Sequence, residues 1–155
     1  MIQQRLFGQQ QTGLSSDDYY TPKWIFDKLD LVFDLDVASP PGGPPFVPCR
    51  QFFTQEDDGL SQSWEGRVWM NPPYSKPAPW IERWIDHADG VALLPTSNGK
   101  WYRSLWASSA SFVPLPPIKF IAGDGRKLGT MPLPCWLVAI GADNVAALRS
   151  FGKVR

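Results

Sequence analysis

Prolines most constrain what this chain can fold into, because a proline lacks the backbone N–H and is excluded from helix interiors and central strands. The chain has 16 of them in 155 residues. The segment 39–45, Ser-Pro-Pro-Gly-Gly-Pro-Pro, must therefore be a loop. Asn-Pro-Pro-Tyr at 71–74 ends the apolar run at 67–70 just as abruptly. Only short helices and strands fit between such breaks, so we expect a domain of many short elements.

Between the breaks, the apolar pattern switches repeatedly between strand and helix periods. Residues 31–37 alternate strictly, which predicts a strand with Asp34 and Asp36 on one face and four apolar side chains on the other: Leu31, Phe33, Leu35 and Val37. Thr21-Pro22 predicts the start of a helix over 22–30. Further helices are predicted from 79, over 98–107 and from 143, and further strands at 50–54, 67–70, 91–94, 111–115, 118–121 and 135–140.

This order of elements favours an α/β fold, a three-layer sandwich with a mostly parallel sheet. Right-handed crossovers place the strand ends together on one edge, where ligands bind in such sheets. Three polar groups follow predicted strands, namely Asp34 with Asp36, residues 71–74 and residues 95–98. We therefore expect these groups to converge.

Length and composition exclude several classes of protein. The length suits one domain, predicted at 19–155, after a flexible Gln-rich arm at 1–18. The 15 Lys and Arg balance the 15 Asp and Glu, which excludes a histone-like basic binder. No apolar stretch is long enough to span a membrane and no secretory signal is recognised, so we expect a cytoplasmic protein. Two cysteines and one histidine predict no metal site.

The sharpest chemical signal is Asn71-Pro72-Pro73-Tyr74. The two prolines stiffen the backbone and free carbonyl groups, and the Asn71 side chain adds another hydrogen-bond acceptor. A planar amine placed there would have its N–H groups engaged and its nitrogen lone pair aimed at an electrophile, with its ring stacked on Tyr74. The alternative interpretation is a turn that ends a strand, whose tyrosine only packs.

With this motif the chain resembles a known family, the S-adenosylmethionine-dependent amino methyltransferases, and within it the small phage and prophage DNA N6-adenine methyltransferases. The resemblance runs from about Tyr20 to Gly141 and rests on several motifs in order: Tyr20-Thr21-Pro22, residues 33–39, residues 53–60, Trp64 to Tyr74, and Leu93-Leu94-Pro95. It implies a compact, truncated Rossmann-like methyltransferase fold, with Asn71, Pro72, Pro73 and Tyr74 in the catalytic position.

The resemblance also implies cofactor contacts. Tyr20, Thr21 and Pro22 match the segment that touches the methionine part of S-adenosylmethionine, although alone they are simply a helix start. Asp36 is similar to the acid that faces the cofactor's ammonium group, with Asp34 as the alternative on the same strand. The alternative interpretation is a solvated strand end, and we favour Asp36 as a ligand because a carboxylate at the ligand edge of the sheet needs a partner.

Asp58 resembles the acid that accepts a hydrogen bond from the cofactor's adenine amine, and Asp57 next to it is almost as good a candidate. For DNA contacts we single out Lys76 and the Gly-rich basic segment 124–129, with Arg126 and Lys127. A solvated turn explains that segment equally well.

Two departures from the family pattern bear on function. Residues 39–45 replace the usual Gly-rich turn, and no separate strand-end acid is available for the cofactor's ribose. The resulting hypothesis is transfer of a methyl group from S-adenosylmethionine to the exocyclic amine of a flipped adenine in DNA. The alternatives are methylation of protein glutamine or RNA adenine, because the motif recognises a planar amine, and a non-catalytic nucleic-acid-binding module with a degenerate methyltransferase fold.

Overall fold

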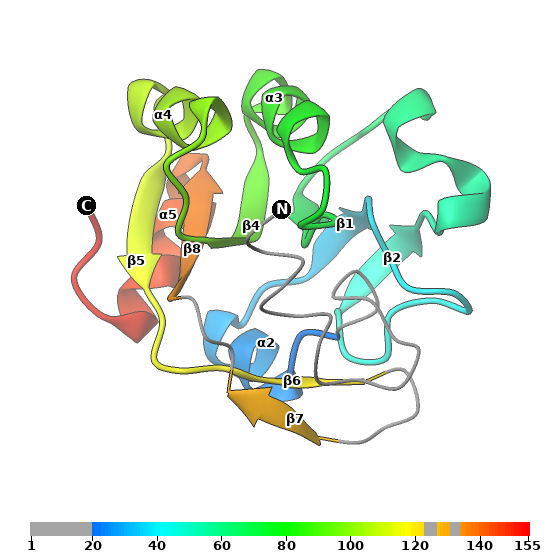
Figure 1. Cartoon of the computed structure of the whole chain (residues 1–155), viewed down its shortest axis with the longest axis horizontal. Helices are drawn as coiled ribbons and strands as arrows, with labels where there is room; N and C mark the ends of the chain where they lie inside the picture. Colours follow the sequence, from blue (N-terminus) through cyan, green and yellow to red (C-terminus); the bar gives the residue numbers. More distant parts are fainter. Residues whose placement is uncertain (1–19, 123–126, 131–133) are drawn as a thin grey trace.

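The computed structural model of the protein describes residues 20–122, 127–130 (backbone only) and 134–155. Within them, one mixed sheet contains β1 (Phe33–Asp36), β2 (Cys49–Phe52), β3 (Val68–Met70), β4 (Gly90–Pro95), β5 (Ser111–Pro114) and β8 (Cys135–Ile140). Its strand order is β2-β1-β3-β4-β8-β5 (Figure 1). The first four strands are parallel neighbours, and β8 runs antiparallel to both β4 and β5.

Helices cover both faces of this sheet. On one face, α2 (Lys23–Leu29) and α5 (Ala142–Leu148) contribute Ile25 and Leu148 to a core that also holds Trp69 of β3. On the other face, α3 (Ala78–His87) and α4 (Lys100–Ala107) lie side by side and pack on a second core (Figure 1). The predicted α/β class and its layers on both sides of a sheet are therefore confirmed.

The pattern of short elements follows the sequence closely. Each predicted helix is present within a few residues of its expected start. The start of α2 is close to the prediction, but Pro22 and not Thr21 occupies the N-cap position, and no side chain caps the helix. Every residue of β4 is buried, which agrees with a strand covered on both faces. The prolines at 40–45 lie in a loop between β1 and β2.

The alternation predicted for residues 31–37 is wrong in one respect. Phe33 packs with Trp69 in the core under α2, whereas Leu35 and Val37 pack in the core under α3 and α4. The cause is an irregularity against β3, where the N–H groups of Asp34 and Leu35 both donate to the Arg67 carbonyl, at 2.8 and 3.3 Å. Two successive donors on one carbonyl are the mark of a β-bulge, which exchanges the faces of the residues on either side of it.

The basic segment at 124–129 is not wholly a loop. Lys127–Thr130 forms β7, which pairs antiparallel with β6 (Lys119–Ile121) in a separate two-stranded sheet (Figure 1). This hairpin connects β5 to β8, and Ile121 exchanges two backbone hydrogen bonds with Tyr20. The predicted arm at 1–18 and Arg126 lie outside the described residues.

Two further sequence expectations concern absences. Over the residues that the structure describes, no helix has the length and apolar character needed to cross a membrane. Over the same residues, no group of three or more His, Cys, Asp or Glu side chains is arranged to hold a metal ion.

Candidate active site

The carboxyl ends of β1 and β3 are neighbours, because Asp36 pairs in register with Trp69. Two cavities open over this edge, one with a volume of about 40 Å³ and the other of about 380 Å³. Ala38, Pro40 and Asn71 line both. The two cavities therefore form one cleft along the sheet edge, which we call the edge cleft.

Asp36 lies at the floor of the smaller cavity and is 2% exposed. Its carboxylate accepts one hydrogen bond from the backbone N–H of Ala38, at 3.2 Å. Burial raises its pKa from 3.8 to about 7, although the Ala38 bond opposes this shift. No lysine or arginine in the described part of the chain forms an ion pair with it. A buried carboxylate in this state favours a cationic ligand.

The alternative acid, Asp34, lies elsewhere. The bulge in β1 separates the two aspartates, and Asp34 accepts a hydrogen bond from the backbone N–H of Arg67 at 2.8 Å. It also lies 3.5 Å from the Arg50 guanidinium, and it lines neither cavity of the edge cleft. The structure therefore places Asp36, and not Asp34, in the edge cleft.

Asn71 bridges the two cavities and is tied to the start of α2. Its Nδ2 donates to the Thr21 hydroxyl at 3.2 Å, and Thr21 is 6% exposed in the smaller cavity. Among the described residues, no donor is bonded to the Asn71 Oδ1 or to the Pro72 carbonyl. Both oxygens are therefore left for other hydrogen-bond donors.

Tyr74 lines the smaller cavity but belongs mainly to the core. It is 6% exposed, and its hydroxyl donates to the Leu93 carbonyl at 3.1 Å. Burial, with a smaller contribution from Cys135, raises its pKa well above the usual value. Tyr74 therefore stays neutral and anchors residues 71–74 to β4.

Asp58 lies at the larger cavity, between the short 3-10 turns η2 (Gln55–Asp57) and η3 (Gly59–Ser61). Its backbone is left-handed, with φ at 53°. The neighbouring Asp57 instead accepts hydrogen bonds from the backbone N–H and hydroxyl of Thr54, at 2.8 and 3.1 Å. Asp57 thus caps the turn, and Asp58 is the one of the two aspartates that lines the larger cavity.

The remaining predicted residues divide clearly. Pro73 and the exposed Lys76 line the larger cavity, and Tyr20 lines the smaller one. Pro22 is buried at the start of α2 and lines neither cavity. Residues 95–98 line neither cavity either, so this polar group does not converge on the edge cleft as expected. For Lys127 only the backbone is described, in β7.

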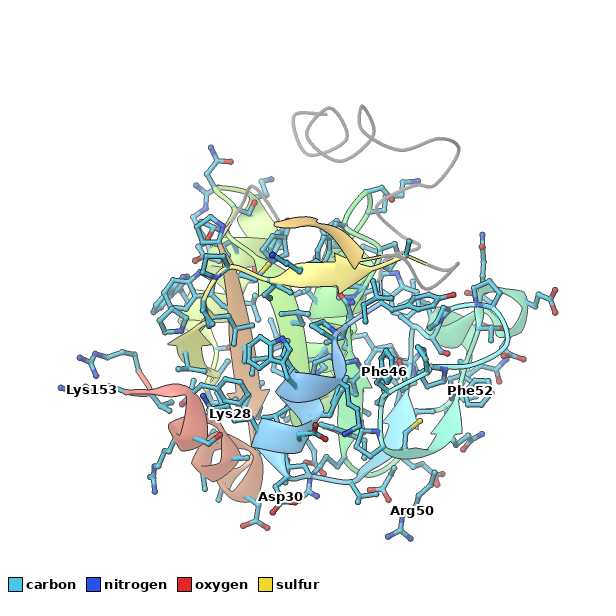
Figure 2. The ribbon with its side chains drawn as sticks, turned by 90° about the horizontal axis from the view of Figure 1, so that it is seen from below. Lys28, Asp30, Phe46, Arg50, Phe52 and Lys153 are labelled. Carbon is cyan, nitrogen blue, oxygen red and sulfur yellow. The ribbon has the colours of Figure 1, made fainter. Side chains whose placement is uncertain are left out.

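Two groups of residues at the edge cleft escaped sequence reasoning. The proline-rich loop supplies walls to both cavities, with Pro44, Phe46 and Val47 on the smaller one. Figure 2 shows Phe46 and Phe52, from the loop and from β2, on the same side of the molecule. Trp80 lines the larger cavity from α3, the helix that the sequence predicts from residue 79. Its half-buried position at the first turn of the helix was not visible in the pattern.

Parallel strands with a polar cleft across their carboxyl ends are the arrangement in which α/β domains typically bind small ligands. Comparison with known sequences narrows this class. The chain belongs to the DNA N-6-adenine-methyltransferase (Dam) family, whose sequence model matches residues 9–138.

Two curated relatives are each named DNA N-6-adenine-methyltransferase. The one from Haemophilus phage HP1 (strain HP1c1) is 34% identical over 97 residues, which cover 56% of this chain and 54% of the relative. The one from Escherichia phage T1 is 30% identical over 107 residues, covering 63% of this chain and 44% of the relative. The chain thus spans about half the length of the curated relatives that it matches.

Proposed function

We propose that this protein transfers a methyl group from S-adenosylmethionine to the exocyclic N6 amine of adenine in DNA. The observation that carries the proposal is the pair of acceptor oxygens on Asn71 and Pro72, next to the buried carboxylate of Asp36 in one cleft. Family membership supports the reaction class. We also propose that the sheet and its helices are a truncated Rossmann-like methyltransferase fold within a single domain at 19–155.

The residues of the edge cleft fit this cofactor. Asp36 is a buried carboxylate without a cationic partner among the described residues, which suits an ammonium group. The larger cavity, at about 380 Å³, is within the size range of small-molecule sites. Asp58 lies on its wall, where it would accept a hydrogen bond from an adenine amine. Tyr20 and Thr21, which line the smaller cavity, would hold the methionine part, and Pro22 would support them from its buried position at the start of α2. When bound, S-adenosylmethionine supplies an electrophilic methyl group.

Asn71 and Pro72 would hold the target amine. Their oxygens accept its two N–H groups, so that its nitrogen lone pair points at the methyl group, and Pro73 stiffens the turn. Tyr74 is proposed to contact the base through the ring that lines the smaller cavity. No covalent enzyme intermediate is needed. The thiol of Cys49 fits no such role, because burial and the Asp36 charge raise its pKa to about 11.

Entry of the base requires movement. The smaller cavity has a volume of about 40 Å³, enough for a few water molecules, and a purine is several times larger. In duplex DNA the target adenine also has to flip out of the stack. We propose that the wall formed by Val47 of the loop and Phe120 of the hairpin opens to admit it.

DNA contacts beyond the target base would come from Lys76, Arg126 and Lys127. Lys76 is exposed at the mouth of the larger cavity, and Lys127 belongs to the hairpin that adjoins the smaller one through Phe120. A projecting two-stranded element suits contact with a duplex groove or backbone. We also propose that the protein acts in the cytoplasm, where DNA and the cofactor are both present.

The test is transfer of labelled methyl from S-adenosylmethionine to unmethylated duplex DNA, followed by nucleoside mass analysis. We expect N6-methyladenine with the native chain and none above background with Asn71→Ala. Label in RNA or in protein glutamine, but not in DNA, would replace this proposal by the corresponding substrate. No transfer to any acceptor, together with no cofactor binding, would leave a non-catalytic nucleic-acid-binding module.

A further inference from the structure

One side chain of α3 holds the segment that follows Asp58. Arg83 donates hydrogen bonds from its guanidinium to three backbone carbonyls of this segment. They belong to Gly59, Leu60 and Gln62. Since Asp58 is bonded directly to Gly59, Arg83 fixes the position of the turn that lines the larger cavity.

Trp64 completes this contact. The Arg83 guanidinium lies 4.4 Å from the centroid of the Trp64 ring, and the indole N–H of Trp64 donates to the Gly59 carbonyl at 2.8 Å. Trp64 also stacks on Trp80, with ring centroids 6.4 Å apart and an angle of 25° between the planes. Trp80 is itself a wall of the larger cavity. Arg83 and Trp64 therefore hold both the Asp58 turn and the Trp80 wall.

The charge of Arg83 is directed at the backbone. No Asp or Glu in the described part of the chain forms an ion pair with it. Its guanidinium instead lies at the carbonyl end of η3, where partial negative charge accumulates. A lysine has one compact ammonium group and lacks the planar fork that reaches several carbonyls at once. The arrangement therefore needs arginine specifically.

We propose that Arg83 is a positioning residue for the adenosine half of the cofactor, an inference that rests on the function proposed above. Arg83 lines neither cavity and acts through Asp58 and Trp80, which line the larger one. Asn71 is held separately, by Thr21. Loss of Arg83 therefore weakens cofactor binding while the rate at saturating cofactor stays close to that of the native chain.

The experiment compares Arg83→Met and Arg83→Lys with Arg103→Met, a change at an exposed arginine of α4 that lines neither cavity. Each variant is titrated with S-adenosylhomocysteine and with 5′-methylthioadenosine, which has the adenosine but no amino-acid group. We expect Arg83→Met to weaken both ligands equally, by about tenfold, as loss of charged hydrogen bonds implies. Arg83→Lys loses less, and Arg103→Met binds as the native chain does.

Asp36→Asn is the contrasting variant, because it should affect only one of the two ligands. It removes the partner of the ammonium group, so it weakens S-adenosylhomocysteine and leaves 5′-methylthioadenosine unchanged. In turnover, Arg83→Met raises KM for the cofactor with kcat within about twofold, the sign of an interaction made equally in ground and transition states. A purely structural defect would lower kcat and the active fraction instead.

Several results would overturn the inference. Native affinity of Arg83→Met for both ligands, or a loss confined to S-adenosylhomocysteine, contradicts a role at the adenosine half. If Arg83→Met is unfolded at the assay temperature, Trp64→Phe decides, because it removes the indole N–H bonded to Gly59 and keeps an aromatic ring beside Arg83 and Trp80. Weaker binding of both ligands supports the inference, and unchanged binding overturns it. A native chain that binds neither ligand contradicts the proposed function itself.

Discussion

At the scale of single residues, Asp36 links burial to ligand binding. Its pKa of about 7 means that the free protein holds a neutral carboxyl group below neutral pH. Only the ionised form attracts an ammonium group. We predict that the Kd for S-adenosylhomocysteine rises by about tenfold for each pH unit below 7, since one proton must leave before the ligand pairs. Isothermal titration calorimetry between pH 5 and 8 measures this, and a flat profile for the native chain would contradict it.

The same carboxyl group should affect stability in the opposite sense. The folded pKa is raised from 3.8 to about 7, so between these values the folded state binds more protons than the unfolded state. The free energy of unfolding contributed by Asp36 therefore falls as pH rises through this window. We predict that Asp36→Asn stabilises the ligand-free protein at pH 8, by about 1–2 kcal/mol, a common gain when a strained functional group is removed. Urea unfolding at pH 5 and pH 8 tests this, and equal effects at both pH values would refute it.

Asn71 offers a prediction about chemistry, because an acceptor oxygen and not the amide as such is required. Asn71→Asp keeps an acceptor, and the Thr21 hydroxyl can donate to the new carboxylate instead of accepting from Nδ2. We predict that Asn71→Ala lowers kcat by at least about a hundredfold, as removal of one transition-state hydrogen-bonding group does, and that Asn71→Asp loses less. Cofactor affinity is the control. Equal loss in both variants would show that the oxygen is not what matters.

At the scale of elements, local signals predict the helices and strands well, and tertiary pairing decides the rest. The Thr21-Pro22 pair predicts the start of α2 because a helix start is signalled by adjacent residues, although Pro22 itself occupies the N-cap position. The bulge in β1 depends on the Arg67 carbonyl, far along the chain, so alternation alone misplaces Phe33. For the same reason the sequence could not separate Asp36 from Asp34. Arg83 left no motif, since it bonds to backbone carbonyls.

The contact between Val37, the residue after β1, and the turn at Asp58 gives a prediction of its own. A Cβ on Gly59 would collide with the Val37 backbone carbonyl and lie 3.2 Å from the Trp80 ring. We predict that Gly59→Ala costs about 1–3 kcal/mol of stability, typical of overpacking, and weakens cofactor binding. Gly42→Ala is the control, because its Cβ meets open space and only its φ of +80° opposes the change. Thermal unfolding with cofactor titration separates the two, and identical behaviour would refute the close approach.

At the scale of the whole molecule, charge is the property that most restricts DNA binding. With 15 basic and 15 acidic residues the chain has no net field to attract DNA, so affinity must come from local contacts near the edge cleft. Lys28 and Lys153 lie away from Phe46 in Figure 2. We therefore do not expect these two lysines to contribute to DNA binding near the edge cleft.

This charge balance leads to a shallow salt dependence. Each phosphate contact contributes about −0.9 to the slope of log K against log salt, so a protein with only a few such contacts has a small slope. We predict that the double change Arg126→Ala with Lys127→Ala reduces the magnitude of this slope by about 2, while cofactor affinity stays unchanged. Lys153→Ala, away from the proline-rich loop in Figure 2, should leave the slope as it is. Fluorescence anisotropy with a labelled duplex over a salt series measures all three proteins. An unchanged slope in the double variant would exclude Arg126 and Lys127 from phosphate contact, and of the three proposed residues it would leave Lys76 at the larger cavity.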